Sequence, residues 1–219
     1  MVRGTFSPAR AWCPAVVARL ACTLGRKVAD YPTSTHTMTE LTIEAAQADM
    51  RRGYLWGAPG VLVSGLVWLA AGMVAALSSD RSAVLALLFG GVAIHPVAVV
   101  VTKLLGCPGK HSAGNKLSGL AAEGTIWLIA GCAIAYGMHM LRIEWFFPTM
   151  LLVIGGRYLT FQTLFGLRLY WVFGAMLCAV GLALAFGRAP AVAGAFAGAA
   201  IELVFAAILF FQAKRDVAA

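Results

Sequence analysis

The sequence predicts an all-α integral membrane bundle of six transmembrane helices. Hydrophobic residues make up 61% of its 219 residues, charged residues make up 12%, and the mean hydropathy is +0.84. A soluble domain of this size needs a larger charged surface. Six apolar stretches, each close to the roughly 20 residues that cross a bilayer, follow one another between Gly57 and Phe211. The loops between them are too short for a second globular domain.

The N-terminal 37 residues differ from the rest, with five basic residues, one acidic residue and scattered Pro, Ser and Thr. Three interpretations stay open: an organellar transit peptide, a signal-peptide core at 11–24 interrupted by Arg19, or a misassigned start. We favour a start at Met38, where the composition becomes regular. The predicted organisation is a leader at 1–37, disordered or not part of the protein, an interfacial amphipathic helix at 38–56, a transmembrane domain at 57–212 and a cytoplasmic tail at 213–219.

The interfacial helix is predicted from apolar residues at helical spacing, namely Ile43, Ala46, Met50 and Tyr54. The transmembrane spans follow at 58–78, 83–103, 118–138, 146–166, 169–187 and 190–211. In the second span, Pro96 removes a backbone donor and predicts a bend. The fourth span contains Arg157 and several polar residues, so a re-entrant segment is the alternative there. Its aromatic start at 145–148 favours a complete span.

Orientation follows from Lys and Arg in the short loops, because positive flanks stay on the cytoplasmic side. Eight basic residues fall on one side (Arg51, Arg52, Lys103, Lys110, Lys116, Arg168, Lys214 and Arg215) and three on the other (Arg81, Arg142 and Arg188). Both termini are therefore predicted to be cytoplasmic. The net charge of +8 lies at span ends rather than on one face, so we expect no nucleic-acid partner.

Glycine pairs seven residues apart recur in the odd-numbered spans: Gly65 and Gly72, Gly124 and Gly131, Gly174 and Gly181. Residues at this spacing share a helix face, and small residues there let a neighbouring helix approach closely in lipid. The pattern predicts helical hairpin repeats with a polar site near the midplane between them. Chance alignment is the alternative, since Gly and Ala are abundant.

Polar residues inside the spans are the candidate site. His95, Arg157 and Glu202 lie near one depth, close to the midplane, whereas Glu123 and Gln162 lie towards the cytoplasmic end and could face one another. Two interpretations fit. An Arg157–Glu202 ion pair would only lock helices together, whereas a cavity would let Arg157 hold an anionic group while Glu202 or His95 takes up protons.

Other motifs carry little chemistry. The Gly-rich loop 106–116 lacks the G-x-x-x-x-G-K-[ST] spacing of a phosphate-binding loop, and we expect it to fix topology and touch anionic lipid. No hydrolase motif occurs, and the five cysteines show no C-x-x-C spacing. We therefore expect no catalytic residues, metal or cofactor. Expected partners are membrane lipids, a small polar or anionic ligand, and a second copy in a homodimer.

Three short motifs, Ala48–Arg51, Gly57–Gly60, and Gly90–Gly91 followed by His95–Pro96, carry a resemblance. From Met38 onwards the chain resembles an uncharacterised family of small bacterial multi-pass membrane proteins, a domain of unknown function. The resemblance implies a bacterial inner membrane and no established activity. The sequence thus favours a small permease-like or ligand-binding protein, and the alternative is a structural or accessory membrane subunit whose buried ion pair specifies packing.

Overall fold

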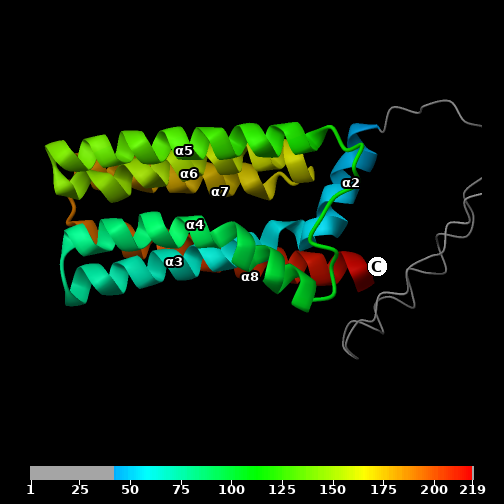
Figure 1. Ribbon diagram of the computed structural model, residues 1–219, viewed down its shortest axis with the longest axis horizontal. Coiled ribbons are helices and arrows are strands. Elements are labelled where there is room, and N and C mark those ends of the chain that lie inside the picture. The colour runs from blue at the N-terminus through cyan, green and yellow to red at the C-terminus, as the bar shows by residue number, and fades with distance from the viewer. Residues whose placement is uncertain (1–41, 219) are drawn as a thin grey trace, which may run out of the picture.

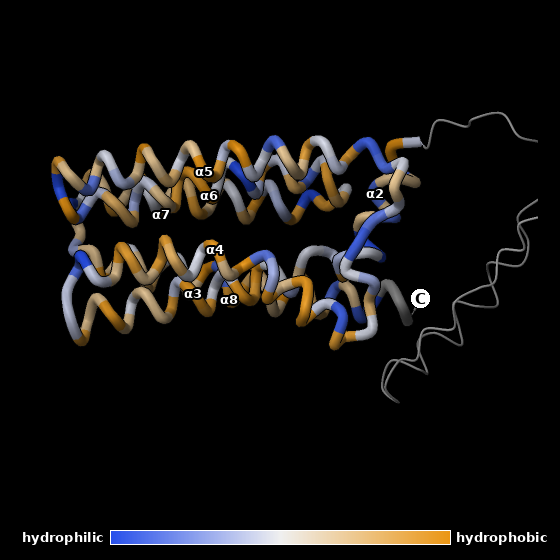
Figure 2. The backbone as a smooth tube through the Cα atoms, in the orientation of Figure 1, coloured by the Kyte–Doolittle hydropathy of each residue, from blue (hydrophilic) through white to orange (hydrophobic). Residues whose placement is uncertain are grey.

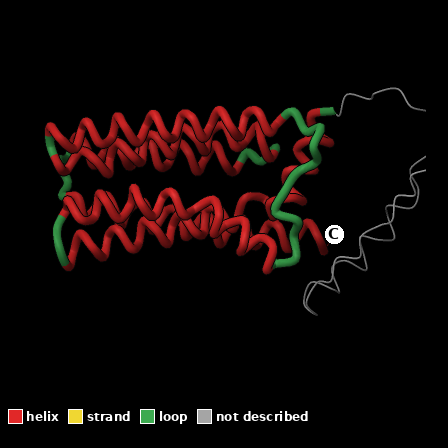
Figure 3. Tube along the Cα trace, in the orientation of Figure 1, coloured by secondary structure: helices red, strands yellow, loops and turns green. Residues whose placement is uncertain are grey.

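The computed structural model describes residues 42–218, so the predictions for 1–37 lie outside the described residues. Within that range the chain is helical and contains no strand (Figure 3). The helices are α2 (Ile43–Tyr54), α3 (Ala58–Leu77), α4 (Asp80–Leu104), α5 (Leu117–Leu141), α6 (Phe146–Phe165), α7 (Leu169–Phe186) and α8 (Ala191–Ala218). Short 3-10 turns, η1 (Leu55–Gly57) and η2 (Ile143–Trp145), precede α3 and α6.

The helices α3 to α8 coincide with the six predicted spans, and the helical membrane bundle is confirmed. Five helical stretches of the described chain are long and apolar enough to cross a membrane, and α6 is not among them. However, α6 buries eleven residues, whereas α4 buries four and α5 three. The more polar α6 is therefore an interior helix, and α4 and α5 are peripheral.

Two three-helix units make up the bundle (Figure 1). In the first, which we call the α3 unit, α3 packs between α4 and α8; in the second, the α6 unit, α6 packs between α5 and α7. The predicted hairpins α3–α4 and α5–α6 each pack as a pair. In the third pair the two helices share only a minor contact, because α7 packs mainly on α6 and α8 packs mainly on α3.

The predicted close packing is present at five of the six paired glycines, where an added methyl group would lie 3.0 Å or less from a neighbouring helix; at Gly124 the nearest atom would be 3.8 Å away. Gly65 and Gly72 face α8, while the pairs of α5 and α7 face α6. The closest approach joins two backbones: a methyl group on Gly174 would lie 2.6 Å from the carbonyl oxygen of Gly155. Such contacts require glycine, because a backbone cannot move aside as a flexible side chain does.

The helix α2 lies across one end of the bundle (Figure 1). A sharp turn connects it to α3, with positive φ at Leu55 (48°), Trp56 (60°) and Gly57 (80°). Each non-glycine residue there pays roughly 1–2 kcal/mol for the left-handed conformation. The turn is held by Tyr170 of α7, whose hydroxyl donates to the carbonyl of Trp56 at 2.7 Å.

Hydrophilic residues gather around α2 (Figure 2). The end of α4, the loop 105–116, the end of α6 and the end of α8 all lie at this end of the bundle, together with the eight basic residues predicted to share one side. Arg81, Arg142 and Arg188, the three basic residues predicted for the other side, lie at the opposite end. The predicted charge separation is therefore present, and α4 also bends in its second half, which contains Pro96 (Figure 1).

Candidate functional site

A cavity of about 170 Å³ lies between α4 and the α6 unit, with α2 as its floor. Three basic side chains line it: His95 of α4, Arg157 of α6 and His111 of the loop 105–116. Two of the predicted site residues, His95 and Arg157, thus share one cavity. We call it the Arg157 cavity.

Arg157 has no acidic partner in contact with it. No carboxylate of the described residues lies within 4 Å of its guanidinium, and its Nε is buried without a hydrogen bond. The guanidinium lies 5.4 Å from the centre of the Phe161 ring, which gives a cation–π contact. Gly124 of α5 leaves room beside the arginine stem, since a methyl group there would lie 3.8 Å from its Cγ.

Glu202 is fully buried and does not form the predicted ion pair. Its Oε1 accepts a hydrogen bond from the hydroxyl of Tyr158 at 3.4 Å, and Oε2 has no partner. The hydroxyl of Ser64 is the second polar group beside the carboxyl. The reason is helical geometry: Arg157 and Tyr158 are consecutive on α6 and point about 100° apart. Tyr158 therefore faces α3 and α8, while Arg157 faces the cavity.

The remaining polar groups of the cavity leave Arg157 and His95 available. The hydroxyls of Thr102 and Thr125 donate to carbonyls of their own helices, at 2.7 and 3.0 Å. His95 is exposed on α4 and has no hydrogen bond within residues 42–215. These two side chains can therefore bind a guest without breaking a protein contact.

Glu123 and Gln162 lie outside the cavity lining. Glu123 is exposed on α5, and the amide oxygen of Gln162 accepts from Thr163 at 3.4 Å. Among the described residues no hydrogen bond joins Glu123 to Gln162. Of the five predicted site residues, His95 and Arg157 therefore share the cavity. Glu202 is buried away from it, and Glu123 and Gln162 lie elsewhere.

Hydrogen bonds between Asp49 of α2 and the loop 105–116 close the floor of the cavity, and we call this contact the Asp49 strap. The sequence did not predict it. The carboxylate of Asp49 on α2 accepts from Ser112 N (2.9 Å), Ser112 Oγ (2.8 Å) and Asn115 Nδ2 (2.8 Å). The hydroxyl of Tyr54 lies 3.0 Å from Nδ1 of His111. The only sequence signal was the motif Ala48–Arg51, which contains Asp49. The Asp49 carboxylate holds the loop 105–116 against α2, and the loop positions His111 in the cavity lining.

Asp49 is ionised at neutral pH. Partial burial raises its pKa, but hydrogen bonds from Asn115 and Ser112, together with nearby His111, lower it and prevail. The net pKa lies below the usual aspartate value. The strap is therefore a charge-assisted contact at neutral pH.

The other face of α2 is tied to the end of α6. The Gln47 side chain donates to the carbonyl of Thr163 at 2.8 Å, and Arg51 donates to the carbonyl of Phe165. These contacts use the last carbonyls of α6, which lack helical partners. In the part of the chain that the structure describes, no group of three or more His, Cys, Asp or Glu side chains has the arrangement of a metal site.

The fold and this cavity define a helical membrane protein with a cationic polar centre. More specifically, the chain belongs to a family of unknown function, DUF7010, whose model matches residues 43–212. Searches among curated proteins and solved structures find no match. The resemblance to an uncharacterised family is confirmed. The function of that family is unknown, so membership assigns no activity to the cavity.

Proposed function

We propose that this protein is a small permease-like or ligand-binding protein of the bacterial inner membrane, with the α2 end cytoplasmic. Its ligand is a small anionic or polar molecule held by Arg157. The observation that carries the proposal is that Arg157 lines a cavity with His95 and has no acidic partner within 4 Å among the residues that the structure describes.

The cost of an unpaired charge supports this proposal. A charged side chain deep in a bilayer costs at least about 2.5 kcal/mol, so intramembrane arginines usually have a partner or a function. An anion in the cavity supplies the missing partner, because a guanidinium binds carboxylate or phosphate oxygens in pairs. The cavity is smaller than the roughly 300–1,000 Å³ of drug-sized sites, so the ligand is small.

His95 supplies a second hydrogen-bonding group of the proposed site. Its ring nitrogens have no hydrogen bond within residues 42–215, so the nitrogen that carries a proton can donate to an anion held by Arg157.

The experiment is thermal stability of the purified, detergent-solubilised protein against a panel of small carboxylates, phosphate, sulfate and amines. A ligand at about 100 times its Kd stabilises the folded state by about 2.7 kcal/mol. We expect an anion to raise the Tm of the wild type and of Arg168→Gln, an exposed arginine outside the cavity, but not that of Arg157→Gln. Arg157→Lys separates charge from paired hydrogen bonding and should retain weak binding. No response to any anion would contradict the proposal.

The alternative is a structural or accessory subunit, and the Glu202 contact favours it. Glu202 of α8, Tyr158 of α6 and Ser64 of α3 gather at the junction of the two three-helix units. Polar contacts between helices stabilise membrane bundles by about 0.6–2 kcal/mol each. If packing is the whole role of the polar centre, Arg157→Gln will change stability but no ligand response.

A further inference from the structure

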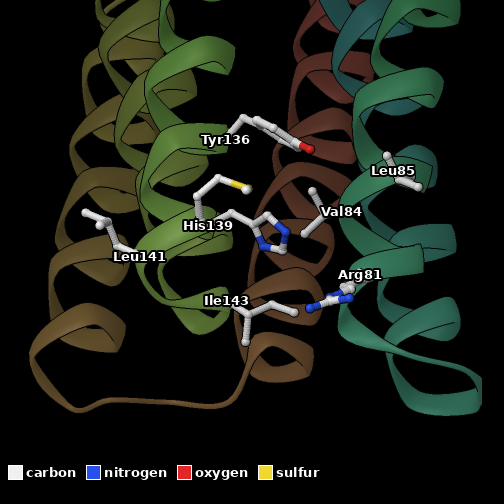
Figure 4. Close-up of a pocket in the computed structure, with 8 residues that line it drawn as sticks. Arg81, Val84, Leu85, Tyr136, His139, Leu141 and Ile143 are labelled. Carbon is white, nitrogen blue, oxygen red and sulfur yellow. The ribbon is translucent and has the colours of Figure 1, made fainter.

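A second and larger cavity, of about 550 Å³, lies between α4 and α5 at the end opposite α2 (Figure 4). Arg81, Val84 and Leu85 of α4 form one wall, and Tyr136 and His139 of α5 face them. None of these residues lines the Arg157 cavity. We call it the Arg81 cavity.

Two nitrogen-bearing side chains in this cavity lack protein partners. Nδ1 of His139 is buried without a hydrogen bond, and the ring is fixed by Tyr136 and Phe146, with centroids at 5.6 and 6.3 Å. No carboxylate of the described residues lies within 4 Å of Arg81, although Asp80 precedes it. Figure 4 shows Arg81 and His139 reaching from opposite walls into the same space.

Arg142, at the same end of the bundle, provides a contrast. Its guanidinium lies 3.6 Å from the carboxylate of Glu144 and 5.6 Å from the ring of Trp145. Arg142 therefore has an ion pair and a cation–π contact with its sequence neighbours, whereas Arg81 has no ion pair with any described carboxylate. The difference makes Arg81 the cation available to a guest.

The surroundings of the cavity are apolar and open to the membrane. Leu85, Phe89 and Val92 of α4 are 47%, 73% and 78% exposed, and Ile129 and Ile134 of α5 are 67% and 55% exposed. These side chains suit acyl chains. Arg81 lies in the first turn of α4, the depth at which lipid headgroups lie beside a spanning helix.

We propose that the Arg81 cavity binds the phosphate of an anionic phospholipid whose acyl chains lie along the exposed faces of α4 and α5. Arg81 donates to the phosphate oxygens, and His139 donates from Nε2, the ring nitrogen that is not buried, when that nitrogen carries its proton. Tyr136 closes the upper wall. A guest needs both an anionic head and an apolar tail, and an anionic phospholipid combines them. The proposal is independent of the ligand proposed for Arg157.

The test uses the full chain in an uncharged detergent and native mass spectrometry. The probes are phosphatidylglycerol, phosphatidylcholine and glycerol 1-phosphate. We expect phosphatidylglycerol to bind most tightly and Arg81→Gln to weaken it about tenfold, the effect of one lost charge-assisted hydrogen bond. Arg142→Gln, which removes the same charge at the same end, should change binding less than twofold. His139→Phe, which keeps the ring and removes the nitrogens, should weaken binding severalfold.

Several outcomes would overturn the proposal. Equal losses in Arg81→Gln and Arg142→Gln would mean diffuse attraction to a positive end rather than a site. Equal binding of phosphatidylcholine would remove the anionic selectivity, and equal binding of glycerol 1-phosphate would make the guest a soluble phosphate ester. If Arg81→Gln does not fold, Arg81→Lys decides, because it keeps the charge and loses the paired hydrogen bonds; unchanged binding then contradicts the proposal.

Discussion

The interface between α6 and α7 and the seam between α4 and α5 are opposite in construction. Between α6 and α7, Gly155 and Gly174 bring two backbones into contact. Between α4 and α5 there is little helix-to-helix packing, and that seam carries the Arg81 cavity and borders the Arg157 cavity. This difference indicates that the glycine-packed interfaces stabilise the bundle. The polar groups that can bind a guest lie instead in the loosely packed seam between α4 and α5.

Among the substitutions that test this comparison, Gly174→Ala should cause the largest loss of stability. The added methyl would meet the carbonyl oxygen of Gly155 at 2.6 Å, so the helices must separate, and we expect a loss of about 3 kcal/mol in unfolding free energy. The measurement is thermal unfolding in detergent. Gly137→Ala is the matched control, because nothing lies within 4 Å of the added methyl there, and it should be neutral or stabilising by up to about 1 kcal/mol. Similar losses in both variants would contradict the packing argument.

The next largest effect is expected at the junction of the two units. Glu202→Leu removes the carboxylate that accepts from the Tyr158 hydroxyl, and the loss of this buried hydrogen bond costs about 1–3 kcal/mol. Glu202→Gln keeps an acceptor oxygen and should lose much less. Because no ion pair within 4 Å joins Arg157 to Glu202, the loss in the double variant of Glu202→Leu and Arg157→Gln should lie close to the sum of the two single losses. A double variant much more stable than that sum would show that the two side chains act as a pair.

The Asp49 strap predicts a pH dependence. Because its folded-state pKa is lowered, its contribution is fully present above the unfolded value, about 4, and is lost as pH falls through the folded value. Wild type should therefore lose stability below about pH 4 more steeply than Asp49→Asn. The difference at neutral pH should be about 1 kcal/mol, since the carboxylate is partly exposed. Parallel pH profiles in thermal unfolding would show that the strap is not charge-assisted.

The smallest expected effect sharpens the comparison from the side of the seam. Arg81→Gln should change the unfolding free energy in lipid-free detergent by less than about 0.5 kcal/mol, because Arg81 is exposed and pairs with no described carboxylate. Thermal unfolding beside Gly174→Ala measures both regions on one scale. A large loss of unfolding free energy in Arg81→Gln would show that the seam between α4 and α5 also stabilises the fold, and would contradict the comparison.

Hydropathy and glycine spacing predicted much of this fold, because both record what a helix must do in lipid. The separation of α7 from α8 was not predictable, since both helices are apolar on all sides and show no preferred face. The Arg157–Glu202 contact is missing because Tyr158, and not Arg157, is the residue of α6 that faces Glu202. The sequence gives the depth of a residue along a span but not the direction of its side chain. Asp49 and Arg81 looked like ordinary interfacial charges, because the partners of Asp49 and the facing wall of the Arg81 cavity lie far away in sequence.

The return of α8 to α3 has a consequence for biosynthesis. The helices α5, α6 and α7 are consecutive, so the α6 unit can assemble as soon as residue 186 has entered the membrane. The face of α3 that carries Gly65 and Gly72 must wait for the last helix of the chain. The α6 unit can therefore be complete while α3 still exposes the glycine face that α8 will cover, so the two units form at different times during synthesis.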